Sequence, residues 1–203
     1  MRMVVVDSGI ENVVMMHADA PDEINETVRT LKESLDRACV VSVGSPAEVL
    51  MITENLSSEV VGERLFEQYL RDSYIEWSGK ILAAGKFSCI HMDGTLAGLL
   101  RQVSAIGFSF IEAMTPAPVG DIPVKDWPRY RAGSDTIYWG GIPGSYFTPI
   151  VNESEFERHV KEVLSVMRKD RRMVLGVADQ VPPDGLERRI RRVSQLVEEF
   201  GAY

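Results

Sequence analysis

The stretch FSCIHMDGTLAGLLRQVSAIGFSFIEAM, residues 87–114, decides the fold class of this 203-residue chain. Two short apolar runs, Phe87–His91 and Phe108–Glu112, flank a segment at about 95–106 whose leucines and valine recur with helical spacing. An apolar run, an amphipathic helix and a second apolar run form the pattern of two parallel strands joined by a helix. The stretch therefore predicts an α/β fold.

The same alternation extends along the rest of the chain. The other predicted strands are Met3–Val6, Val49–Thr53, Thr136–Trp139 and Met173–Val177, and the other predicted helices span about 22–42, 58–84, 121–132, 153–169 and 184–200. Six such units fit a doubly wound sheet or part of a (β/α)8 barrel. The phosphate-binding patterns G-x-G-x-x-G and G-x-x-x-x-G-K-[ST] are absent, which favours the barrel. A complete barrel takes eight units and typically about 250 residues. We therefore expect a single domain over 1–203, an incomplete TIM barrel of about six units.

Composition excludes several classes of function. The 22 Lys and Arg against 30 Asp and Glu give a net charge of −8, which disfavours nucleic-acid binding. No apolar run has the length of a membrane span, so no membrane partner is expected. The opening MRMVVVDSGIENVV does not have the pattern of a signal peptide. Cys39 and Cys89 lie in apolar surroundings and are predicted to be buried thiols in a reducing compartment, so we expect a cytoplasmic protein.

Polar side chains follow several of the predicted strands. Catalytic residues of parallel α/β folds collect at the carboxyl ends of the strands. His91 and Asp93 are two residues apart, so on an extended segment they point to the same side. The predicted catalytic residues are His91, Asp93 and Glu112, and the predicted substrate-binding residues are Glu54, Gly141 and Asp179.

Three interpretations of the His-x-Asp pair stay open at this level. His91, Asp93 and Asp179 have the donor atoms to bind a divalent metal. The same groups also suit acid–base catalysis, with the carboxylates shifting the pKa of the imidazole. Alternatively, His91 makes only a hydrogen bond across the barrel mouth while Asp93 caps the next helix. Gly140-Gly141 marks either a tight turn or a close approach of the backbone to a ligand.

Other polar residues are assigned to the surface. His17 and His159 lie among charged neighbours and are predicted to be exposed. On the last predicted helix, apolar residues form one stripe, and we interpret the arginines on the other face as solvated rather than phosphate-binding. These arginines are Arg188, Arg189, Arg191 and Arg192.

Several segments together resemble the uroporphyrinogen decarboxylase superfamily. Residues 87–122 are similar to its H-x-D/C-G segment, DTIYWGGIPG (135–144) to its glycine-rich strand end, and VLGVADQVPPDGLERRIRRVSQLVEEFG (174–201) to its closing strand, proline turn and helix. Residues 52–85 resemble its helical region upstream. The resemblance covers about 20–201 and corresponds to the C-terminal half to two thirds of the family pattern.

The resemblance implies a TIM barrel and, first, the activity that names the superfamily. Uroporphyrinogen decarboxylase removes carboxylates from the acetate side chains of a tetrapyrrole in porphyrin biosynthesis and uses no cofactor. The arginines and the aspartate that hold its substrate lie before the matched region, so none is carried over to this chain.

A second branch of the superfamily implies a different chemistry. Its cobamide-dependent methyltransferases bind zinc through a His-x-Cys pair and a distant Cys. His91 matches the histidine, Asp93 stands at the first cysteine, and the second falls near Ala178 or Asp179. This branch implies a metal-dependent methyltransferase or O-demethylase that acts with a corrinoid, with zinc or a harder divalent metal as cofactor.

A third alternative is non-catalytic. A barrel without its first strands exposes two unpaired sheet edges, which favour association. Such a half-barrel would form a homo-oligomer or pair with a complementing barrel fragment.

Overall fold

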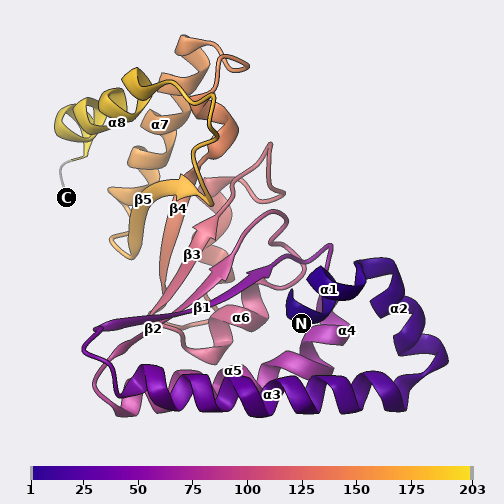
Figure 1. Ribbon diagram of the computed structural model, residues 1–203. Coiled ribbons are helices and arrows are strands. Elements are labelled where there is room, and N and C mark those ends of the chain that lie inside the picture. Colours follow the sequence, from indigo (N-terminus) through magenta and orange to yellow (C-terminus); the bar gives the residue numbers. More distant parts are fainter. Residues whose placement is uncertain (1, 202–203) are drawn as a thin grey trace.

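The computed structural model describes residues 2–201, with side chains from Val4 onward. Its five strands are β1 (Val49–Leu56), β2 (Phe87–Met92), β3 (Phe110–Met114), β4 (Ile137–Pro143) and β5 (Met173–Ala178). They form one parallel sheet in the order β1-β2-β3-β4-β5 (Figure 1). A doubly wound sheet reverses its strand order at one point, and this order does not reverse. The architecture is therefore part of a TIM-barrel-like fold, with the sheet open between β1 and β5 in the described residues.

Helices alternate with the strands. They are α1 (Arg2–Ser8), α2 (Ile10–Asp19), α3 (Pro21–Val43), α4 (Gly62–Leu65), α5 (Arg71–Ala83), α6 (Leu100–Ile106), α7 (Glu153–Met167) and α8 (Glu187–Phe200). A π-helical turn covers Phe66–Leu70, and 3-10 turns cover Val124–Tyr130 and Gly144–Phe147. No helix within residues 2–201 combines the length and apolar character needed to cross a bilayer.

The helices pack against one face of the sheet. Ser78 of α5 hydrogen-bonds Ser88 of β2 at 2.9 Å, and Ser104 of α6 hydrogen-bonds Tyr138 of β4 at 2.8 Å. Side chains of successive strand residues alternate between faces, so residues 87, 89 and 91 of β2 lie on the opposite face. Phe87 on that face is 53 % exposed. His91 therefore lies on the sheet face that the helices leave open.

Five of the six predicted strands are confirmed within a few residues, but Met3–Val6 is not a strand. The segment forms α1, whose Val4 packs into the core while Val6 stays 71 % exposed. The three consecutive valines favour an extended chain by propensity, and packing of a short helix onto the core overrides that preference. The helix α2 that follows was not predicted from the sequence.

Two predicted helices differ in detail. The helix expected over 58–84 is interrupted by the π-helical turn at Phe66–Leu70. The helix expected over 121–132 is a 3-10 turn, because Pro123 precedes it and Pro128 inside it has no N–H to donate to a regular α-helix.

Two side chains predicted to be solvated are buried. His159 of α7 is 6 % exposed, and Arg189 of α8 is 2 % exposed. The Arg189 guanidinium donates to the carbonyl oxygens of Tyr146, Thr148 and Val151. This arginine ties α8 to the segment between β4 and α7, so its position on the polar side of the helix does not indicate exposure.

Candidate functional site

His91 and Glu112 meet at the carboxyl ends of β2 and β3. The parallel register of the two strands places His91 directly beside Glu112. The imidazole Nδ1 lies 2.7 Å from Glu112 Oε2, and the two side chains are 13 % and 15 % exposed. The hydrogen bond to Glu112 raises the pKa of His91, while burial acts in the opposite direction.

The second ring nitrogen of His91 faces Asp179. In the neutral imidazole, a proton on Nδ1 that is donated to Glu112 leaves Nε2 with a free lone pair. Nε2 is shielded from solvent and has no hydrogen-bond partner among the described residues. Asp179 Oδ1 lies 3.8 Å away, which is too far for a hydrogen bond. A buried polar atom without a protein partner is rare, so this nitrogen is available to a ligand.

Asp93 and Asp179 add negative charge to the pair. Asp93 follows β2, and its backbone N–H donates to Leu56 of β1. Burial raises the pKa of Asp93; the nearby His91 lowers it, while Asp179 and Glu112 raise it further. Asp179 follows β5 with a φ of 64°, in the left-handed region. The structure thus brings together His91, Asp93, Glu112 and Asp179 from three strand ends.

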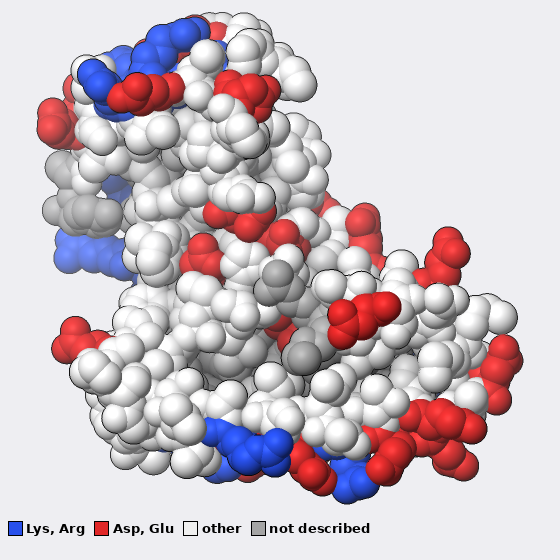
Figure 2. Space-filling view, in the orientation of Figure 1, with Lys and Arg blue, Asp and Glu red and all other residues white. Residues whose placement is uncertain are grey.

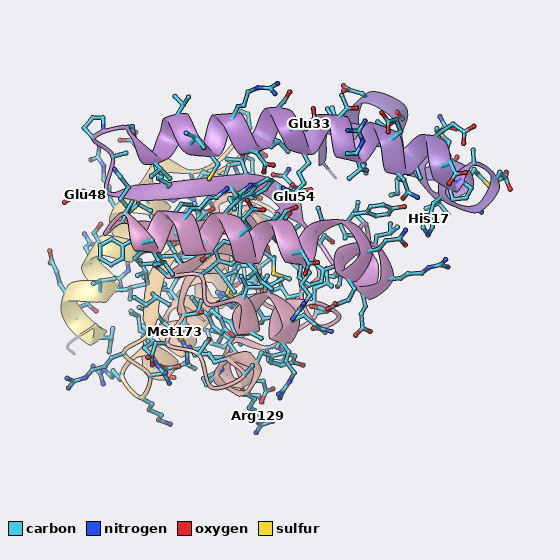
Figure 3. All side chains as sticks on the ribbon, turned by 90° about the horizontal axis from the view of Figure 1, so that it is seen from below. His17, Glu33, Glu48, Glu54, Arg129 and Met173 are labelled. Carbon is cyan, nitrogen blue, oxygen red and sulfur yellow. The ribbon has the colours of Figure 1, made fainter. Side chains whose placement is uncertain are left out.

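Glu54 lies on the other face of the sheet, away from the His91 cluster, so its part in substrate binding stays a prediction. It lines a cavity of about 570 Å³ between β1, α3 and α5, where Figure 3 shows it. Burial, together with the nearby charge of Glu54, raises the pKa of Tyr74 in this region. The physical reason for its place is strand alternation: Glu54 shares its side with Ile52 and the buried Leu56.

Gly141 is also separate from the cluster, and its surroundings are those of a packing residue. An added Cβ would lie 2.9 Å from Val163 of α7. Its carbonyl oxygen accepts a hydrogen bond of 2.7 Å from His159 Nε2. Gly141 therefore allows β4 and α7 to approach closely, while contact of this residue with a substrate stays a prediction.

Sequence reasoning missed Asp121. Its carboxylate accepts from the backbone N–H groups of Leu96 and Ala97, and so orders the loop that follows Asp93. Asp121 therefore holds the turn that precedes α6, whereas the N-cap of α6 is Leu99 and has no side-chain capping hydrogen bond. No local pattern links Asp121 to residues about 25 positions earlier, because only the folded sheet brings them together.

The metal set His91, Asp93 and Asp179 is not a preformed centre. Within residues 2–201, no group of three or more His, Cys, Asp and Glu side chains is arranged to hold a metal ion. Cys89 lies two residues before His91, and burial, with a smaller contribution from Glu112, raises its pKa to about 12. This residue is therefore a thiol near neutral pH, whereas metals and electrophiles react with thiolates.

Comparison with known proteins finds a solved structure with the same fold. No protein-family model matches the sequence, and no curated protein matches it. Among solved structures, a methyltransferase from Methanosarcina mazei has the same fold, with a TM-score of 0.73 and 15 % sequence identity. The similarity covers 95 % of this chain and 54 % of the methyltransferase. The chain thus spans about half the length of that methyltransferase.

Proposed function

We propose that this chain is the site-bearing half of a metal-dependent methyltransferase of the uroporphyrinogen decarboxylase superfamily. The observation that carries the proposal is the buried Nε2 of His91, which has no partner among the described residues while Glu112 holds Nδ1. Histidines that bind metals characteristically donate their other ring N–H to a carboxylate, which orients the ring. The tetrapyrrole decarboxylase alternative is supported by the sequence resemblance alone.

Two of the residues present suit a divalent metal, although the described residues hold no preformed group of three ligands. His91 Nε2 would be one ligand and Asp179 another, with Asp93 adjacent. Zinc binds nitrogen and carboxylate oxygen at about 2.0–2.2 Å. The 3.8 Å between Nε2 and Asp179 Oδ1 is shorter than two such bonds, so one ion has room to contact both atoms. A bound metal ion would hold the methyl acceptor in its deprotonated, nucleophilic form.

Glu112 and Asp93 would act on a bound metal without coordinating it, Glu112 through the ring of His91 and Asp93 through its charge. Glu112 keeps the ring of His91 in one orientation and its proton on Nδ1. Asp93 adds negative charge beside the ring, which favours a cation there. A corrinoid, as in the superfamily's methyltransferases, is the methyl carrier that we propose.

The affinity for zinc tests this proposal. We expect His91→Ala to weaken zinc binding by about 100-fold or more, and Glu112→Gln by roughly 10- to 100-fold, the range for groups that orient a metal ligand. Competition against a chromogenic chelator measures both. His17→Ala is the matched control, because His17 hydrogen-bonds Tyr69 away from the site and its loss should leave zinc affinity unchanged. Equal zinc affinity in all three variants would contradict the proposal.

The open sheet favours a second element of the function, namely assembly. Edge strands expose unpaired backbone groups and pair readily with other chains. Because β1 and β5 are edges here and the chain spans 54 % of its structural neighbour, we propose that it pairs with a second copy or a complementing fragment.

Sedimentation over a concentration series should show a dimer of the purified chain. Met51→Pro places a residue without an N–H in the edge strand β1 and should shift the equilibrium toward monomer. Leu82→Ser, at an exposed position of α5, is the matched surface control and should leave the dimer intact. A monomer at every concentration would contradict pairing with a second copy and leave only the complementing fragment.

A further inference from the structure

A second cavity-lined region, separate from the His91 cluster, lies where the N-terminal helices cover the sheet. The cavity has a volume of about 570 Å³, and ligand pockets of proteins have volumes of about 300–1,000 Å³. Figure 3 shows α3 and α5 running side by side, with β1 and Glu54 between them. Most of the wall is apolar and includes Leu31, Leu35, Leu50, Ile52, Trp77 and Ile81. The proposed function makes no use of this cavity.

Tyr74 of α5 brings a buried hydroxyl group to the cavity. Its side chain is fully buried, and the rings of Phe66, Trp77 and Phe108 hold its ring in place at centroid distances of 6.0–6.2 Å. The hydroxyl oxygen makes no hydrogen bond with any described residue. Burial, together with the nearby charge of Glu54, raises the pKa of this hydroxyl well above its usual value, so it keeps its proton. A buried hydroxyl whose proton has no acceptor is rare, which indicates that a ligand accepts it.

The charges around the cavity favour a neutral ligand. Lys32 is the one cation among the described residues that line it, and its ammonium group lies 2.8 Å from Asp36 and 3.3 Å from Glu76. Asp7 and Glu54 add carboxylates to the wall. Figure 2 shows further acidic side chains over α2 and the start of α3, at the lower right. An anion would find no free cation among these lining residues, and any charged ligand would lose its hydration among apolar side chains.

We propose that this cavity binds a neutral, largely apolar molecule with a carbonyl oxygen, and that Tyr74 donates a hydrogen bond to that oxygen. An apolar cavity of about 150 Å³ holds one benzene ring, so this cavity has room for roughly 20 non-hydrogen atoms. Burial of the ligand against the apolar wall supplies most of the affinity, and the hydroxyl of Tyr74 fixes the orientation of the ligand. The inference goes beyond the proposed function, because neither His91 nor a metal takes part in it.

Fluorescence titration with Prodan tests the inference. Prodan is a neutral naphthalene ketone of about this size, and its analogue 2-dimethylamino-6-propylnaphthalene lacks the carbonyl oxygen. Tyr74→Phe keeps the ring and removes the hydroxyl, so it should weaken Prodan binding about fivefold, the loss of one hydrogen bond, without weakening the binding of the analogue. Tyr138→Phe is the matched control, because it removes the hydroxyl of another buried tyrosine, which bonds Ser104 away from the cavity. It should leave the binding of both compounds unchanged.

A second substitution tests the place of the site. Leu35→Trp fills the cavity from α3 and should weaken the binding of both compounds at least tenfold, whereas Leu82→Trp, at an exposed position of α5, should have no effect. Absence of Prodan binding, or binding that survives Leu35→Trp in protein with the circular dichroism of the wild type, would overturn the cavity as a ligand site. Prodan binding that Tyr74→Phe leaves unchanged, or weakens no more than that of the analogue, would overturn the role of Tyr74. Tyr74→Phe decides alone if Leu35→Trp does not fold.

Discussion

Replacing Arg189 by methionine is expected to lower the free energy of unfolding by about 3–5 kcal/mol, the range for breaking a buried charged network. The guanidinium is 2 % exposed and donates to three carbonyl oxygens at 2.6–2.7 Å, and Nε lies 3.1 Å from Glu153 Oε2. Methionine fills part of the volume but donates no hydrogen bond. The buried carbonyls of Tyr146, Thr148 and Val151 would then lack donors, at roughly 1–3 kcal/mol for each unpaired group.

Urea denaturation of the wild type and the variant measures this effect. Arg191→Met is the matched control on the same helix, because the Arg191 side chain is 76 % exposed and forms a surface ion pair with Glu187. We expect that variant to lose less than about 0.5 kcal/mol. Similar losses in the two variants would show that Arg189 is not the buried anchor of α8.

Gly140→Ala is expected to cost about 3 kcal/mol of stability, because strain and overpacking of this kind cost about 1–3 kcal/mol each. Gly140 has a φ of 149°, and an added Cβ would lie 2.4 Å from the carbonyl oxygen of Met114 and 2.8 Å from its N. Both atoms belong to the backbone of β3, so relief of the clash requires the strands to separate. The displaced segment closely follows Glu112, so zinc affinity should fall as well.

Gly79→Ala provides the matched control for this substitution. Gly79 lies inside α5, and no atom stands within 4 Å of the position that an added Cβ would take. Alanine in place of an exposed helical glycine stabilises by about 0.5–1 kcal/mol. Chemical denaturation of both variants gives the comparison. If Gly140→Ala were as stable as the wild type, the close contact between β3 and β4 at this point would be wrong.

The strands and their order could be predicted from the sequence, because apolar runs alternate with amphipathic helices over most of the chain. The same pattern misleads at Met3–Val6, where strand propensity is strong but the chain packs as α1. Propensity describes a preference that tertiary packing can override, most easily at a short segment. The helix break at Phe66–Leu70 has no signal of its own in the sequence.

The candidate site, like the fold, could be predicted from the sequence only in part. His91, Asp93, Glu112 and Asp179 could be predicted from their places at strand ends, because parallel strands of one sheet bring their carboxyl ends together. The same criterion also selects Glu54, since position past an apolar run does not say which face a side chain takes. In the structure Glu54 shares the more buried side of β1 with Leu56, and both residues lie past Thr53, where the predicted strand ends.

Long-range partners account for what the sequence did not indicate. His159 and Arg189 look like surface residues because their neighbours in the chain are charged, yet their partners lie 18 and 38–43 residues away. Only the fold brings such donors to the carbonyl oxygens they satisfy.

The protonation and metal binding of His91 test the central claim most directly, through two-dimensional ¹H–¹⁵N NMR of the imidazole nitrogens. We predict that neutral His91 carries its proton on Nδ1, and that zinc shifts the resonance of Nε2 while His17 and His159 stay unchanged. A proton on Nε2, or an Nε2 resonance that zinc does not move, would contradict the role of His91 and Glu112 as the core of a metal-dependent methyl-transfer site.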